Sequence, residues 1–176
     1  MEGSASSLPY ETGFFDLVYC VNAFHHFPDK RGFLSEARKV LKPGGVLAII
    51  GMEPREVLPG EWWLYEYFEC ARARDLERFP SYEDVVAWAK DAGLAGSERK
   101  LVHLIESTIE GRGMLEHHFL KKGGTSQLAL MSDNEYECGL DKIRRAISEA
   151  ERSGRQCVFR AHIRQYMITS VKTDSL

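Results

Sequence analysis

The stretch between Phe14 and Ile50 constrains the fold more than any other part of the sequence. Residues 14–21 (FFDLVYCV) are apolar at most positions without alternating, which is typical of a strand covered on both faces. Residues 33–41 place apolar side chains on one face of a helix, and residues 46–50 (VLAII) form a second apolar run. A strand, a helix and a strand joined by short connections form a right-handed crossover. The stretch therefore predicts two parallel strands of an α/β sheet.

Short polar motifs mark where the predicted helices begin and end. Asp29 is a candidate N-cap for the first helix, and Pro43 with the two glycines after it is expected to end that helix. Ser81, with Asp84 in the capping-box position, predicts the start of another helix, which Gly93 should end.

The remaining segments are predicted from their apolar patterns. Residues 60–79 predict a helix with aromatic side chains on nearly every face of its first turns. This pattern fits either a helix buried on two sides or a lid over a substrate pocket. Residues 98–107 predict a strand, and residues 111–124 predict a loop-rich segment with a short helix. Residues 132–154 form a long amphipathic pattern with a capping box at its start, and residues 156–172 predict one or two strands.

Composition excludes several functional classes. The chain has 176 residues and a net charge of -3 without a basic block, so we expect neither a nucleic acid nor a membrane as partner. No apolar run approaches the length of about 20 residues that spans a bilayer, and the N-terminus lacks the pattern of a signal peptide. The four cysteines lie far apart in the sequence. They are expected to be reduced in a cytoplasmic protein.

Two pairs of adjacent histidines stand out, His25–His26 and His117–His118. Adjacent side chains diverge on a helix and on a strand, and the sequence holds no H-x-x-x-H or Cys/His ligand spacing, so we expect no metal site. The first pair follows directly after the first strand. There a histidine could act as a general base near neutral pH, or it could pack against and position other groups. Both alternatives stay open at this point.

Residues 2–50 resemble the class I S-adenosylmethionine-dependent methyltransferases, of the kind found in ubiquinone and menaquinone biosynthesis. The motifs that carry the resemblance are Gly3-Ser4-Ala5, Leu8-Pro9-Tyr10, Phe15-Asp16, His25-His26 and Arg38-Lys39-Val40-Leu41-Lys42-Pro43-Gly44-Gly45. The helix predicted at residues 81–94 and the C-terminal strands are also similar to family elements. The resemblance therefore covers most of the chain.

The resemblance implies a Rossmann-like, doubly wound and mainly parallel sheet with an antiparallel C-terminal edge, here missing its first strands. It implies S-adenosylmethionine bound across the carboxyl ends of the strands, as in other doubly wound folds. By family position, the cofactor-binding residues are Ser4, Ala5, Cys20, Val21, Asn22 and His25. Ser4 stands where the family usually has an aspartate, and its hydroxyl would accept a hydrogen bond from the adenine amino group less strongly than a carboxylate would.

The expected substrate-binding residues are His26, Glu53, Trp62, Tyr65 and His117. No catalytic residue is predicted, because methyl transfer to a good nucleophile needs little beyond alignment and removal of water. We expect one domain over residues 1–176, with a lid or substrate-side insertion at 55–125.

A glycine-rich cofactor loop, which the family has near its start, is not found in this sequence; Gly111-Arg112-Gly113 lies too far downstream to serve as one. The chain thus resembles the C-terminal half to two-thirds of such an enzyme. One expectation is a small-molecule methyltransferase in an N-terminally truncated form. The alternative is a non-catalytic fragment that acts through self-association or protein partners. The first strand would then present an unpaired edge, which predicts a homodimer through that edge.

Overall fold

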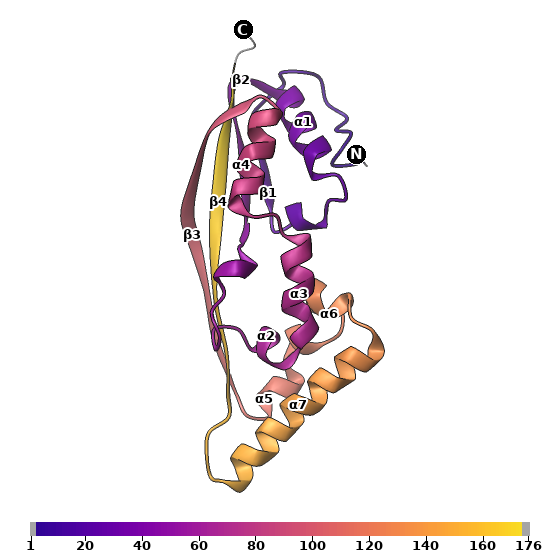
Figure 1. The fold of residues 1–176 in the computed structure, drawn as a ribbon, viewed down its shortest axis with the longest axis vertical. Helices are drawn as coiled ribbons and strands as arrows, with labels where there is room; N and C mark the ends of the chain where they lie inside the picture. The colour runs from indigo at the N-terminus through magenta and orange to yellow at the C-terminus, as the bar shows by residue number, and fades with distance from the viewer. Residues whose placement is uncertain (1–2, 174–176) are drawn as a thin grey trace. The chain divides into compact units, whose positions relative to one another are not determined.

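The computed structural model describes residues 3–173 and divides the chain into two compact units (Figure 1). The sheet unit consists of residues 3–53, 78–103 and 165–173. The helical unit consists of residues 54–77 and 104–164. Strands β3 (Leu94–Glu110) and β4 (Val158–Lys172) each contribute residues to both units.

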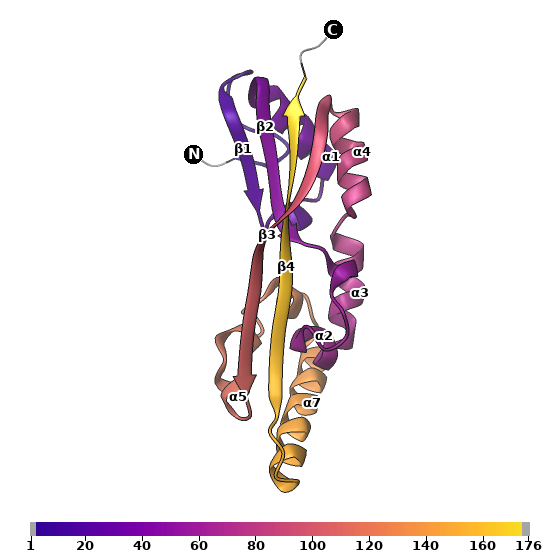
Figure 2. The same cartoon turned by 90° about the vertical axis from the view of Figure 1, so that its left-hand side faces the viewer.

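The sheet contains four strands in the order β1-β2-β4-β3. Strand β1 (Phe15–Val21) pairs in parallel with β2 (Leu41–Met52), which confirms the predicted crossover. Strand β4 pairs antiparallel with β2 and separates it from β3, as Figure 2 shows. Residues 156–172 thus give a single strand, and it lies inside the sheet and not at its edge. The α/β prediction is confirmed, but the described sheet is mixed, not mainly parallel.

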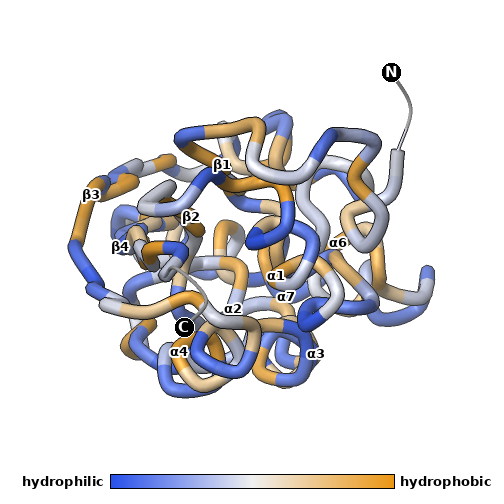
Figure 3. The backbone as a smooth tube through the Cα atoms, turned by 90° about the horizontal axis from the view of Figure 1, so that it is seen from above, coloured by the Kyte–Doolittle hydropathy of each residue, from blue (hydrophilic) through white to orange (hydrophobic). Residues whose placement is uncertain are grey.

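Helices cover one face of the sheet in the sheet unit. Helix α1 (Lys30–Val40) connects β1 to β2, and helix α4 (Tyr82–Asp91) precedes β3. Both lie on the same side of the strands in Figure 1, and in Figure 3 the tube of β1 is mostly coloured hydrophobic. The buried core between helices and sheet consists of Cys20, Phe24, Phe33, Leu34, Ala37, Leu41, Leu47, Ile49, Val85, Ala89 and Leu94.

Capping explains where these two helices begin. The carboxylate of Asp29 accepts a hydrogen bond from the Gly32 N–H at 2.7 Å. Ser81 and Asp84 form the predicted capping box, so both expected starts are confirmed. Helix α1 ends at Val40, before Pro43, because Leu41 already has an extended backbone and begins β2. The strand predicted at residues 46–50 is therefore longer at both ends.

The helical unit contains helices α2 (Trp63–Tyr67), α5 (Gly113–Glu116), α6 (Ser126–Ala129), α7 (Asp133–Arg152) and most of α3 (Glu69–Arg78). The single helix expected at residues 60–79 is divided at Phe68, whose φ of -119° and ψ of 81° are not helical. Phe68 is buried, and its ring lies against Gly139 of α7. The predicted capping box at the start of α7, between Ser132 and Glu135, is confirmed.

Candidate functional site

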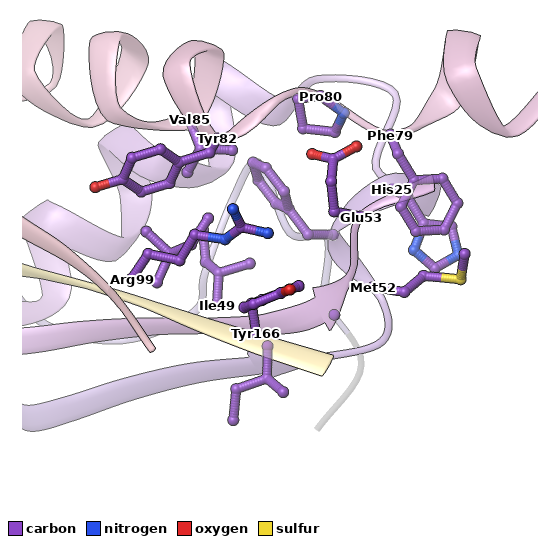
Figure 4. Close-up of a pocket in the computed structure, with 14 residues that line it drawn as sticks. His25, Ile49, Met52, Glu53, Phe79, Pro80, Tyr82, Val85, Arg99 and Tyr166 are labelled. Carbon is purple, nitrogen blue, oxygen red and sulfur yellow. The ribbon is translucent and has the colours of Figure 1, made fainter. Parts of the chain in front are cut away.

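A pocket lies in the sheet unit at the carboxyl ends of β1 and β2, and we call it the strand-end pocket (Figure 4). Its walls come from residues 24–25 after β1, residues 49–53 at the end of β2, the start of α4, and strands β3 and β4. The cavity volume is about 60 Å³, and the whole depression, open solvent included, measures about 490 Å³. Such a pocket can enclose the reacting end of a molecule whose remainder lies in the open part.

Aromatic rings form one side of this pocket. The imidazole of His25 stacks on the ring of Phe79, with 3.9 Å between ring centroids and 13° between planes. The imidazole of the exposed His26 lies 4.0 Å from that of His25. His25 therefore serves as a flat wall of the pocket, while His26 is not among the residues that line it.

The position of His25 makes it a weak base. Burial, followed by the nearby charges of His26, Arg78 and Lys30, lowers the pKa of His25 to about 3. A general base works best with a pKa near the working pH, so this imidazole is neutral at pH 7 but poorly suited to take up a proton. The packing and positioning alternative is therefore favoured for His25.

Arg99 brings the clearest polar group into the pocket. Its guanidinium carbon lies 3.6 Å from the ring centroid of Tyr166 and 5.7 Å from that of Tyr82. Arg99 is on β3, Tyr166 is on β4 and Tyr82 opens α4, so three distant segments meet here. Glu53, just beyond β2, lines the same pocket. The pocket thus combines aromatic walls with one cationic and one acidic side chain (Figure 4).

Sequence reasoning missed Arg99, Tyr82 and Tyr166. The period of two in a strand predicts which residues share a face with Arg99, but the sequence does not show which face lines the pocket. The Ser97 hydroxyl lies 2.8 Å from that of Ser170, and Ser170 is buried on the helix-covered face of the sheet. Arg99, two residues further along β3, is then expected on that same face.

Of the residues expected near the methionine end of the cofactor, Asn22 lies next to this pocket. Asn22 turns the chain after β1 with a φ of 49°, which is uncommon for a residue other than glycine. Its N–H donates to the Ile50 carbonyl at 2.8 Å, and its side-chain amide donates to Gln165 at 3.3 Å. Cys20 is buried, and burial raises the pKa of its thiol. Val21 is exposed at the end of the same strand.

The residues expected near adenine lie in the segment before β1. The Ser4 hydroxyl is exposed and lies 3.1 Å from that of Ser6. Ala5 packs against the core of the sheet unit. Neither residue lines the strand-end pocket.

Three predicted substrate residues belong to the helical unit. Trp62 and Tyr65 line a separate cavity of about 240 Å³, together with residues 57–60, Glu66 and Arg72. The Tyr65 hydroxyl donates to the fully buried Asp75 at 2.7 Å. His117 is half-buried, and burial lowers its pKa. Of the eleven predicted site residues, the structure brings His25 and Glu53 into the strand-end pocket, with Asn22 beside it, and Trp62 and Tyr65 into the separate cavity.

Neither a cluster of metal ligands nor a membrane span is found in the described part of the chain. Within residues 3–173, no three His, Cys, Asp or Glu side chains gather as they would around a metal ion. Over the same residues, each helix is too short or too polar to cross a bilayer.

Comparison with known proteins finds methyltransferases that are similar to parts of this chain. Residues 1–49 match the family described as "Methyltransferase domain". The chain is 33% identical over 102 residues to 2-methyl-6-phytyl-1,4-hydroquinone methyltransferase 2, chloroplastic, of Oryza sativa, which covers 58% of this chain and 27% of the relative. It is 39% identical over 62 residues to the phthiotriol/phenolphthiotriol dimycocerosates methyltransferase of Mycobacterium leprae, which covers 35% of this chain and 23% of the relative. The matched part thus spans about a quarter of the length of these relatives.

Solved structures share the fold over nearly the whole chain. A protein of Anabaena variabilis assigned as a methyltransferase from an antibiotic biosynthesis pathway matches with a TM-score of 0.67 and 17% identity, covering 97% of this chain and 72% of that one. The YcgJ protein of Bacillus subtilis matches with a TM-score of 0.56 and 22% identity, covering 99% and 71%. Part of the sequence and the fold are thus similar to those of S-adenosylmethionine-dependent methyltransferases.

Proposed function

We propose that this chain takes part in S-adenosylmethionine-dependent methyl transfer to a small-molecule acceptor. The observation that carries the proposal is the strand-end pocket, which lies beside the turn at Asn22. Gly51 connects the two, because it lines the pocket and a Cβ placed on it would lie 3.9 Å from the Asn22 Oδ1. In this arrangement the reactive end of the cofactor and the acceptor would meet at the ends of β1 and β2.

The residues present suit one part of the cofactor. Cys20, Val21 and Asn22 offer a short neutral stretch with an amide side chain at its end, which fits the methionine part of the ligand. Ser4 offers an exposed hydroxyl that can accept from the adenine amino group. When bound, the cofactor supplies the methyl group on a sulfonium. This chain's residues would hold and orient it.

The pocket favours an aromatic acceptor. Phe79, Tyr82 and Tyr166 provide flat apolar surfaces, and the Arg99 guanidinium can donate hydrogen bonds to an oxygen of the acceptor. A ring that carries hydroxyl groups, such as the hydroquinone in the names of the plant relatives, matches these groups. The net charge of -3 favours such a molecule over a nucleic acid.

The insertion expected at residues 55–125 is proposed as the substrate side of a single domain over residues 1–176. A cytoplasmic location is also proposed, on the four cysteines that form no disulfide.

Calorimetric titration tests the cofactor proposal. S-adenosylhomocysteine should release or absorb heat on binding to this chain and should raise its melting temperature. Asn22→Gly, which removes the side-chain amide and tolerates the positive φ, should weaken binding at least tenfold. Ser35→Ala, which removes an exposed hydroxyl on α1, should leave it unchanged. If neither heat nor a thermal shift appears, this chain does not bind the cofactor and the proposal is wrong.

A second proposal is that the chain acts without catalysis, through self-association. Strand β1 lies at the end of the four-strand order and pairs only with β2 in the described sheet. Its free backbone edge can pair with β1 of another copy and so give a homodimer. Sedimentation at high concentration tests this, since a strictly monomeric profile would contradict it.

A further inference from the structure

A row of residues crosses the ends of the strands on the helix-covered face of the sheet. Gly51 of β2 lies in the middle of this row, because its register partner on β4 is Tyr166 and a Cβ placed on it would lie 3.9 Å from the Asn22 Oδ1. The Tyr166 ring in turn contacts the Arg99 guanidinium, whose carbon lies 3.6 Å from the ring centroid. The row therefore leads from Asn22, on the proposed cofactor side, to the cation of the strand-end pocket.

Gly51 leaves space in the middle of this row. Apart from the glycine itself and its neighbours in the chain, the Asn22 Oδ1 is the only described heavy atom within 4 Å of a Cβ built there. A backbone without a side chain lets a bound molecule approach closely. Glu53, two residues further along the chain, lines the same pocket as Gly51. A ligand group above this glycine would lie beside Asn22 and would face the pocket that Arg99 and Glu53 line.

Arg99 and Glu53 offer complementary hydrogen-bonding groups. A guanidinium carries only donors, and an ionised carboxylate carries only acceptors. In Figure 4 the Arg99 guanidinium is drawn between the side chains of Tyr82 and Glu53. Glu53 carries the only carboxylate among the described lining residues, and His25, with its pKa of about 3, is a poor proton acceptor. A hydroxyl group uses both partners, since its oxygen accepts from the guanidinium and its proton is donated to the carboxylate.

We propose that the acceptor is a phenol, that Arg99 binds its hydroxyl oxygen and that Glu53 accepts its proton. These roles rest on the proposed methyl transfer and assign the groups that act in it. The hydroxyl proton passes to a carboxylate oxygen of Glu53, the phenol oxygen forms a bond to the methyl carbon, and the bond from that carbon to the sulfonium sulfur breaks. A methyl ether, a neutral thioether and a protonated carboxyl group result. The positive charge of Arg99 stabilises the oxygen while it becomes negative.

The walls of the pocket select a phenol over an aliphatic alcohol. Phe79, Tyr82 and Tyr166 offer flat surfaces on which an aromatic ring packs. A phenol hydroxyl, with a pKa of about 10 as in tyrosine, gives up its proton far more readily than the hydroxyl of an alcohol does. Transfer of that proton to a carboxylate beside a guanidinium is therefore feasible near neutral pH.

Binding of para-nitrophenol to the whole chain, without any cofactor, tests the proposal. The ionised form of this phenol absorbs visible light, so a pH titration measures the pKa of the bound molecule. Arg99→Gln should raise this pKa by about 1 or more, because the ionised form loses a positive neighbour. Glu53→Gln should lower it by about 1 or more, because the ionised form loses a negative neighbour. A general loss of structure would not move the pKa in opposite directions.

The same strand offers matched control variants. Glu98 and Lys100 flank Arg99 on β3, point to the other face of the strand and are exposed. Glu98→Gln and Lys100→Gln make the same charge changes and should leave the pKa of the bound phenol unchanged. Arg99→Lys keeps the positive charge and should restore most of the shift. Para-nitroanisole, which has no hydroxyl proton to donate, should bind equally to the unmodified chain and to Glu53→Gln.

The outcomes separate these roles from the proposed methyl transfer. No binding of para-nitrophenol, an unchanged pKa in either variant, or shifts in the same direction would each overturn the roles of Arg99 and Glu53. If S-adenosylhomocysteine binds but the phenol does not, only these roles are refuted. The two opposite shifts without binding of S-adenosylhomocysteine would support a phenol site and contradict the methyl transfer.

Discussion

Replacing His25 by phenylalanine should stabilise the protein in mild acid. The imidazole stacks on Phe79, and burial with the nearby positive groups lowers its pKa to about 3. In the unfolded chain the pKa returns to about 6.5. Below pH 6.5 the unfolded state binds a proton that the folded state does not bind. The contribution of neutral His25 to the free energy of unfolding is therefore fully present above pH 6.5 and is lost as the pH falls toward 3.

The magnitude follows from the pKa difference. The gap between 6.5 and about 3 is about 3.5 units, which corresponds to ~5 kcal/mol over the full range. The imidazole is only half-buried, and screening by solvent reduces this to about 2 kcal/mol. A change from pH 7 to pH 5 crosses less than half of the interval between pH 6.5 and about pH 3. About 1 kcal/mol of the free energy of unfolding should therefore be lost.

Urea denaturation at pH 7 and pH 5 measures this loss. The loss should be about 1 kcal/mol smaller in His25→Phe than in the unmodified chain, because phenylalanine cannot be protonated. The same substitution at His103, whose side chain is exposed, is the matched control. Equal losses in the unmodified chain and the His25→Phe variant, or an NMR titration that puts the pKa of His25 near 6.5, would refute the reasoning.

Three further substitutions probe packing and capping, each measured by chemical denaturation. Gly139→Ala would drive a methyl group into the Phe68 ring and should destabilise by about 1–2 kcal/mol despite its better helix propensity; unchanged stability would show that the ring can move aside. Asp75→Ala would leave the half-buried Tyr65 hydroxyl and the buried Gln127 side-chain amide without their acceptor and should cost ~3 kcal/mol, whereas a cost below ~1 kcal/mol would contradict the burial of Asp75 and Gln127. Ser81→Ala removes the cap of α4 and should cost ~1 kcal/mol, and no measurable change would mean that the cap contributes nothing.

Local signals in the sequence were sufficient to predict where the helices begin and that a crossover joins β1 to β2. The caps at Asp29, Ser81 and Ser132 depend on hydrogen bonds to amides three residues away, so the sequence contains both partners. The break at Phe68 has no local signal, since neither glycine nor proline stands there. It coincides with packing of the Phe68 ring against α7, some seventy residues further along the chain.

The candidate site was predictable only where it follows strand ends. His25 and Glu53 come directly after β1 and β2, and the ends of parallel strands are where doubly wound folds bind ligands. Arg99 and Tyr166 reach the same pocket only because β4 lies between β2 and β3, an order that the sequence pattern does not specify. Periodicity predicts which face of a strand a residue is on, but it does not predict which strand is its neighbour.

The place of β4 in the sheet has a consequence for synthesis. Residues 165–172 separate β2 from β3 in the sheet unit, although the ribosome makes them after every other segment of that sheet. Strands β1 and β2 can pair early, but the sheet cannot close until the last strand has left the ribosome. Contacts between residues so distant in sequence also form slowly. Until β4 has been made, the edge of β2 that β4 later pairs with is unpaired. A chaperone would protect the nascent chain during this interval.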